Sequence, residues 1–203
     1  VIAMRISLGL MSCVISGLFG SVACAQGVVT QWNFPSGFSL TSPAPSTGSG
    51  TASLLAGTTA TSAGGLTNAG STEAAAGSVA WNTSGYAAIG TGNGTRGVNF
   101  AVNTTGQSNL IFRYDVRNSN SSSRFFRIEY TTDGTNYTDF ATTTAVLGGD
   151  AWTNNRTFDF SGISAANNNA NFGVRVVAIF DPNGTDYLGT GAAYATTGTV
   201  RYD

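Results

Sequence analysis

From residue 97 onward, apolar side chains recur at every second position in one stretch after another. Val98, Phe100 and Val102 form the first such set. Further sets are Leu110, Phe112, Tyr114 and Val116; Phe126, Ile128 and Tyr130; Phe158 and Phe160; Phe172, Val174, Val176 and Phe180; and Val200 and Tyr202. Because successive side chains of a strand point to opposite faces, this period predicts strands with one face against a core. Turn-rich breaks separate these stretches, and the expected fold is all-β: a two-sheet antiparallel sandwich.

Turn-forming residues support this prediction. The chain has 27 glycines and only 9% charged residues, a mixture that favours strands joined by many turns. Asp133-Gly134 lies between two strand candidates, 124–132 and 136–144. Asp-Gly supplies the positive φ that tight hairpin turns require, so we expect a hairpin there.

Residues 1–25 have the features of a signal peptide. Arg5 provides a basic start, residues 6–22 are mostly apolar, and small residues at 23 and 25 fit cleavage before Gln26. A membrane anchor and a lipoprotein modified at Cys24 are the alternatives. The expected location of the protein is therefore extracellular or on the cell surface.

The mature part, residues 26–203, is expected to be a single β-sandwich domain. A first strand is expected at 28–34, with Trp32 on its core face. Residues 35–80 are rich in Ser, Thr, Gly and Ala and predict a long loop-rich insertion with a short strand at 51–56; a flexible linker is the alternative. The last strand, which ends the sequence at Asp203, is expected to be truncated.

Composition argues against several functions. The net charge is −1, which predicts no nucleic-acid partner, and no membrane insertion is expected after cleavage of the leader. The chain has no histidine, and both cysteines, Cys13 and Cys24, fall in the leader. The mature protein should therefore have no disulfide, thiolate or imidazole chemistry. Paired carboxylates, as in glycoside hydrolysis, are the one catalytic arrangement that the composition still allows. Glu73 and Glu129 are the only glutamates and lie in no active-site motif, so we expect no enzyme.

Charged residues fall out of phase with the apolar rows and should face outward. If strands 110–117 and 123–130 pair directly, the favoured register sets Asp115 opposite Arg127 and Arg113 opposite Glu129. Such a ladder can simply keep a sheet soluble. Alternatively, it forms a polar platform for acidic sugars, with Phe125 as an exposed stacking ring.

Two further groups of residues are candidates for ligand binding. Trp81 and Tyr86 are expected in a surface loop, where they could stack on sugars. Asp181, Asn183 and Asp186 place oxygen atoms at alternating spacing on a turn, so calcium is the one cofactor considered; an ordinary Pro-Asn-Gly turn is the alternative.

Several segments together resemble an exported β-sandwich domain of bacterial surface proteins, often ones carrying a PEP-CTERM sorting tail. These segments are Gln31-Trp32-Asn33-Phe34, Ala80-Trp81-Asn82-Thr83-Ser84-Gly85-Tyr86, the stretch from Phe125 to Gly134, and the stretch from Asn167 to Val177. The resemblance implies a jelly-roll, galactose-binding-like domain of an envelope or secreted protein and supplies no catalytic residues. No Pro-Glu-Pro motif follows Asp203 in this sequence.

The sequence thus predicts a non-catalytic extracellular or cell-surface module that binds carbohydrate or matrix. Its candidate ligand-binding residues are Trp81, Tyr86, Phe125, Arg113 and Arg127. A structural spacer or display domain is the alternative, followed by a secreted hydrolase. Ligand identity and oligomeric state do not follow from the residues.

Overall fold

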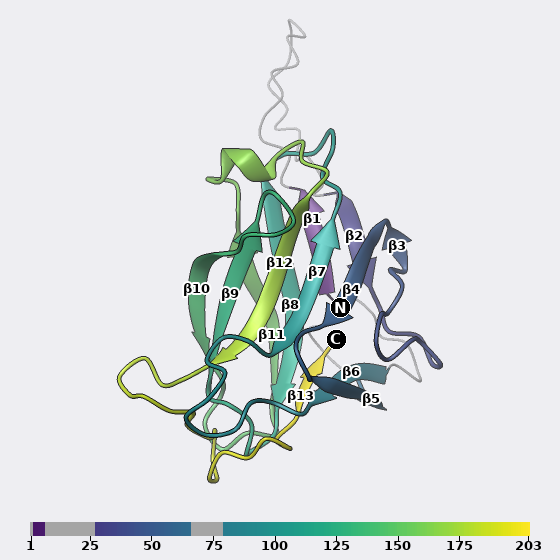
Figure 1. Cartoon of the computed structure of the whole chain (residues 1–203). Helices are drawn as coiled ribbons and strands as arrows, with labels where there is room; N and C mark the ends of the chain where they lie inside the picture. The colour runs from purple at the N-terminus through teal and green to yellow at the C-terminus, as the bar shows by residue number, and fades with distance from the viewer. Residues whose placement is uncertain (1, 7–26, 66–78) are drawn as a thin grey trace, which may run out of the picture.

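The computed structural model describes residues 2–6, 27–65 and 79–203 (Figure 1). Strands dominate it, and a single turn of 3-10 helix, η1 (Ser164–Ala166), is the one helical element in this part of the chain. No helix among these residues is long and apolar enough to cross a membrane. The all-β prediction is confirmed.

The strands form two sheets in which every pairing is antiparallel. The eight-stranded sheet has the order β3 (Thr47–Gly48), β2 (Val28–Trp32), β1 (Ile2–Ile6), β8 (Leu110–Asn118), β13 (Val200–Tyr202), β6 (Val79–Ser84) and β5 (Thr59–Gly64), with β11 (Trp152–Asp159) also paired to β8. The five-stranded sheet has the order β10 (Thr138–Thr144), β9 (Phe125–Thr131), β12 (Phe172–Ile179), β7 (Gly97–Val102) and β4 (Gly50–Leu54). The predicted two-sheet antiparallel sandwich is therefore confirmed.

The core lies between the two sheets and contains the predicted apolar rows. Phe100 of the five-stranded sheet contacts Trp32 and Phe112 of the eight-stranded sheet, at ring-centroid distances of 5.1 and 5.8 Å. Phe112, Phe126 and Phe172 are at most 4% exposed, and Phe158 packs against the same cluster while partly exposed. Alternation along each strand directs these rings inward, and their burial is the main driving force for sandwich formation.

The predicted hairpin is present between β9 and β10. Gly134 has φ +78°, a left-handed conformation that a side chain would disfavour. The Asp133 carboxylate accepts hydrogen bonds from the Asn136 side chain and from the backbone amides of Thr135 and Asn136. These bonds hold the pKa of Asp133 well below its usual range.

The predicted pairing of strands 110–117 and 123–130 is wrong. The first is β8 in the eight-stranded sheet and the second is β9 in the five-stranded sheet. The chain between them passes from one sheet to the other, which lets both strands turn their apolar faces toward the shared core. Asp115 and Arg127 therefore lie on opposite layers of the sandwich.

The sequence before residue 97 contributes more strands than its composition indicated. The expected strand at 51–56 is present as β4, and β3 and β5 lie in the same Ser/Thr-rich stretch. Residues 2–6, at the start of the predicted signal peptide, form β1. The predicted cleavage site before Gln26, both cysteines and Glu73 lie outside the described residues.

Candidate functional site

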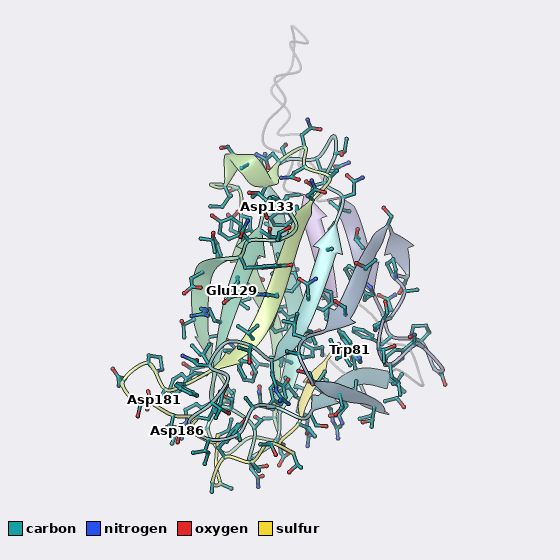
Figure 2. The ribbon with its side chains drawn as sticks, viewed as in Figure 1. Trp81, Glu129, Asp133, Asp181 and Asp186 are labelled. Carbon is teal, nitrogen blue, oxygen red and sulfur yellow. The ribbon has the colours of Figure 1, made fainter. Side chains whose placement is uncertain are left out.

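Trp81 is buried, so its expected position in a surface loop is wrong. It belongs to β6 (Figure 2). Its side chain is 0% exposed. Its indole Nε1 donates a hydrogen bond to the Leu40 carbonyl at 2.7 Å, and its ring lies 5.9 Å from Phe34 and 6.2 Å from Phe100. The polar neighbours Asn82 and Ser84 had indicated a loop, but β6 pairs on both sides and its alternate residues face the core.

Tyr86 is buried as well, with 2% of its surface exposed. Its hydroxyl lies 2.7 Å from that of Thr83, and its ring meets Phe126 edge-on. Burial raises the pKa of Tyr86 to about 12. Neither Trp81 nor Tyr86 can offer a ring to a dissolved polysaccharide.

The three remaining candidates are divided between the two sheets. Arg113 is on β8, where it pairs with Thr157 of β11 and Ala3 of β1. Phe125 and Arg127 are on β9 in the other sheet, on the side facing away from the core. Only Phe125 and Arg127 can therefore contribute to one surface.

That surface is the outer side of the five-stranded sheet at β9, β10 and β12. Register places Thr144 opposite Phe125, Thr142 opposite Arg127, and Asp139 opposite Glu129. Arg175 of β12 lies opposite Glu129 on the other side of β9. Directly opposed residues share a face. Val177 and Ile179 of β12, opposite Arg127 and Phe125, lie on the same side but are buried. The name polar face is used below for the remaining residues: Phe125, Arg127, Glu129, Asp139, Thr142, Thr144 and Arg175.

Glu129 organises the charges of the polar face (Figure 2). It is 2% exposed, and its carboxylate accepts hydrogen bonds from both Arg127, at 2.7 Å, and Arg175. Arg127 also contacts the exposed carboxylate of Asp139 at 3.1 Å. Two guanidinium groups thus face two carboxylates, so this surface has no net charge to attract acidic sugars.

Tyr137 adds an aromatic ring that sequence reasoning missed. The guanidinium carbon of Arg175 lies 3.8 Å from the centre of this ring, within cation–π range. The Tyr137 hydroxyl donates to Asn99 Oδ1 at 2.7 Å, which ties the residue to β7. Tyr137 follows the hairpin turn just before β10, outside any alternating row, so no apolar pattern could have indicated it.

The solvent-facing part of the polar face presents mixed chemistry. Thr142 and Thr144 are exposed, and Phe125 is half-buried. The side chains of Asp139 and Arg127 are 65% and 27% exposed. Hydroxyl, carboxylate, guanidinium and ring groups side by side can form hydrogen bonds to sugar hydroxyls and contact an apolar sugar face.

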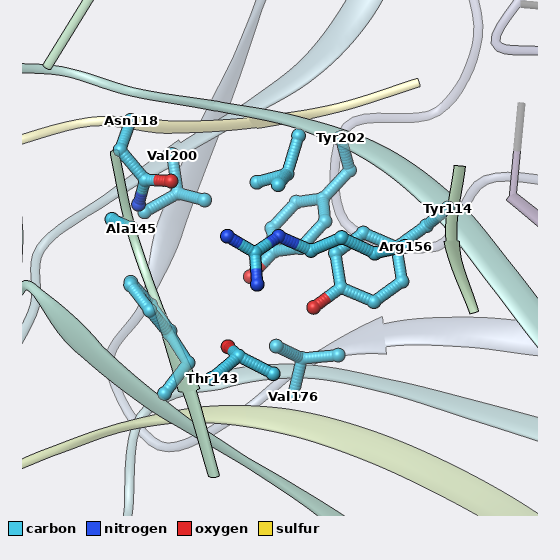
Figure 3. Close-up of a pocket in the computed structure, with 10 residues that line it drawn as sticks. Tyr114, Asn118, Thr143, Ala145, Arg156, Val176, Val200 and Tyr202 are labelled. Atoms are coloured by element: carbon cyan, nitrogen blue, oxygen red, sulfur yellow. The ribbon is translucent and has the colours of Figure 1, made fainter. Parts of the chain in front are cut away.

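A small cavity lies between the edges of the two sheets, where Arg156 of β11 reaches toward β10 (Figure 3). Arg156 donates to the Thr144 carbonyl at 2.6 Å, while its Nε and the Asn118 Nδ2 find no hydrogen-bond partner. The cavity measures about 10 Å³, which is room for about one water molecule. It is far too small for a sugar.

The candidate calcium residues lie in the loop after β12. The Asp181 carboxylate accepts the Asn183 amide at 3.0 Å, and the Asp186 carboxylate accepts the amides of Gly90 and Tyr187 at 2.8 and 2.7 Å. Within the described ranges, no three His, Cys, Asp or Glu side chains gather as a metal would need. The carboxylates stabilise the loop here, and calcium binding stays a prediction without structural support.

Glu129 is poorly placed to act as the general acid or base of the hydrolase considered above. Its carboxylate is held by two guanidinium groups and covered from solvent, which leaves it no access to a substrate proton.

No protein-family model, no curated protein and no solved structure matches this chain. The evidence for the candidate site therefore comes from its geometry.

Proposed function

We propose that this protein is a non-catalytic module of an exported or cell-surface protein and that it binds polysaccharide or surface matrix through the polar face. The resemblance to exosortase-sorted surface proteins supports the location, and the leader features support export. The proposal that the polar face binds a ligand depends on one observation. On the paired strands β9 and β10, the exposed residues Thr142, Thr144 and Asp139 flank Phe125 and Arg127.

The charge balance narrows the ligand class. Glu129 and Asp139 offset Arg127 and Arg175, so electrostatic attraction contributes little and hydrogen bonding dominates. We therefore propose a neutral rather than an acidic polysaccharide. Side chains on paired strands also have less freedom to lose on binding than side chains on loops.

A structural spacer or display domain is the second candidate. It is favoured by the same ion pairs, because a charge-matched ladder also protects a sheet face from aggregation. The two functions differ in whether the polar face has a ligand.

Affinity electrophoresis in gels containing neutral or acidic polysaccharides tests the proposal. We expect Phe125→Ala to weaken binding to a neutral polysaccharide by about tenfold, equal to about 1.4 kcal/mol. Thr51→Ala is the matched control, since Thr51 is exposed at the far edge strand of the same sheet. If neither the wild type nor either variant is retarded, the spacer function remains as the explanation. If all three are retarded equally, Phe125 does not belong to the binding site.

Export is tested separately by expressing the full chain in a Gram-negative host and sequencing the N-terminus of the secreted protein. A start at Gln26 is expected. Retention of the full chain in the cytoplasm would contradict export.

A further inference from the structure

Arg156 of β11 is directed into the space between the two sheets. It lies opposite Tyr114 of β8, whose ring is in the core, and directly opposed residues share a face. Its guanidinium group donates to the Thr144 carbonyl of β10 at 2.6 Å. Since β10 and β11 belong to different sheets, this bond connects the sheets along an edge where no backbone pairing joins these two strands.

The cavity beside Arg156 is bounded by both sheets (Figure 3). Val116 and Val200 line it from the eight-stranded sheet, and Phe126 and Val176 line it from the five-stranded sheet. These apolar walls keep the local dielectric constant low, so a charge inside the cavity acts more strongly than it would in water.

Two hydrogen-bond donors at this cavity lack an acceptor. The Nε of Arg156 and the Nδ2 of Asn118 are covered from solvent and have no hydrogen-bond partner among the described residues. Asn118 itself is only 6% exposed. Both nitrogen atoms donate but cannot accept, and a buried donor without an acceptor destabilises the fold. The cavity therefore favours an occupant that accepts hydrogen bonds.

The positive charge of Arg156 faces no negative group. None of the residues that line the cavity is acidic, and no carboxylate in the described part of the chain forms an ion pair with Arg156. Tyr114 and Tyr202 line the cavity as well, but burial raises the pKa of both hydroxyls, to about 12 for Tyr114. Both hydroxyls therefore stay protonated at neutral pH and supply no negative charge.

The size of the cavity limits what it can hold. At about 10 Å³ it has room for about one water molecule, which excludes sulfate, phosphate and any carboxylate ligand. A water molecule could accept both hydrogen bonds but would leave the arginine charge unbalanced. A monatomic anion accepts the same bonds, which its charge strengthens, and also balances Arg156.

We propose that this cavity binds a single halide ion, of which chloride is the common one, between the Arg156 guanidinium and the Asn118 amide. The site goes beyond the proposed polysaccharide binding, which uses the outer side of the five-stranded sheet. An ion here contacts residues of both sheets and strengthens the connection of β11 to β10. Because only the folded protein has this cavity, chloride should stabilise the fold.

The first test measures the melting temperature of the full chain while chloride is replaced by gluconate at constant ionic strength. Gluconate is too large for the cavity, and constant ionic strength keeps general screening the same. We expect a rise of about 3–6 °C when chloride exceeds its dissociation constant by about tenfold. Arg156→Gln, which keeps a donor but removes the charge, should lose this rise.

Arg113→Gln is the matched control. Arg113 is also half-buried, and its Nε also lacks a partner among the described residues, but it lies on the opposite face of β8, away from the cavity. This variant should keep the full chloride-dependent rise. Equal rises in the wild type and Arg156→Gln, or no rise in the wild type, would overturn the proposal.

The second test locates the ion directly and depends on no variant. Crystals of the wild type grown in bromide should show an anomalous peak within hydrogen-bond distance of Arg156 Nε and Asn118 Nδ2. Density for water alone at this place would refute the site, even if Arg156→Gln fails to fold. A bromide peak without a chloride-dependent melting temperature would mean binding at crystal concentration only and would also refute the proposal. Neither test involves the polar face, so polysaccharide binding succeeds or fails separately.

Discussion

Replacing Trp81 by alanine tests, through the free energy of unfolding, whether this residue lies in the core or on the surface. Sequence context predicted a sugar-stacking ring on a loop, whereas the structure buries the ring between Phe34 and Phe100. The two alternatives lead to very different effects on stability.

The magnitude follows from the burial. Truncating a fully buried tryptophan removes its apolar contacts and leaves a cavity, which costs about 3–5 kcal/mol. The hydrogen bond to the Leu40 carbonyl adds little, because Leu40 is 37% exposed and water can replace the indole. In a domain of this size the loss lowers the melting temperature by about 6–20 °C.

Urea unfolding followed by circular dichroism measures this effect, with Leu147→Ala as control. Leu147 is 67% exposed, so its truncation should change the free energy of unfolding by less than about 0.5 kcal/mol. Trp81→Phe should lie between the two, since it keeps a ring in the core. A loss below about 1 kcal/mol for Trp81→Ala would refute the burial of this residue and return it to the ligand-binding candidates.

Three other perturbations test particular parts of the fold. Hydrogen bonds depress the pKa of Asp133 in the folded state. The stability that this carboxylate contributes is therefore present above its unfolded pKa, near 4, and is lost as the pH falls. Melting curves of Asp133→Asn, recorded across the acid range, should lack this part of the pH dependence. Burial raises the pKa of both Tyr86 and Tyr114 to about 12. The stability that comes from keeping these hydroxyls protonated is fully present below about pH 10 and is lost as the pH rises toward 12. Tyrosinate absorbance should therefore show that the two tyrosines ionise together with alkaline unfolding. Gly97→Ala should cost at least about 2 kcal/mol in urea unfolding, because its Cβ would lie 2.0 Å from a β12 carbonyl oxygen, while Gly64→Ala meets open space and should change little.

The alternating rows of the sequence predicted the strands after residue 97 well. Phe112, Phe126 and Phe172 face the core as their phase indicated, and Asp133-Gly134 forms the expected turn. A period of two fixes which side of a strand is apolar, but it does not say which strand pairs with which. The supposed pairing of strands 110–117 and 123–130 failed for this reason.

The candidate site was predictable only in part. Phe125 and Arg127 were found because they are out of phase with a core row, and both lie on the polar face. Trp81 was misplaced because Ser, Thr and Asn around it are common both in loops and in the short paired strand β6. The joining of Glu129 to Arg175 depends on the pairing of β9 with β12, a long-range contact that no local pattern encodes.

Titration of isotopically labelled protein with soluble oligomers of a neutral polysaccharide, followed by amide chemical shifts, tests the binding proposal most directly. We expect the shift changes to concentrate on residues 125–127 and 139–144, where β9 and β10 present the polar face. Changes confined to residues 50–54, on the far edge strand of the same sheet, or no changes at all at saturating ligand, would contradict a binding role for this face.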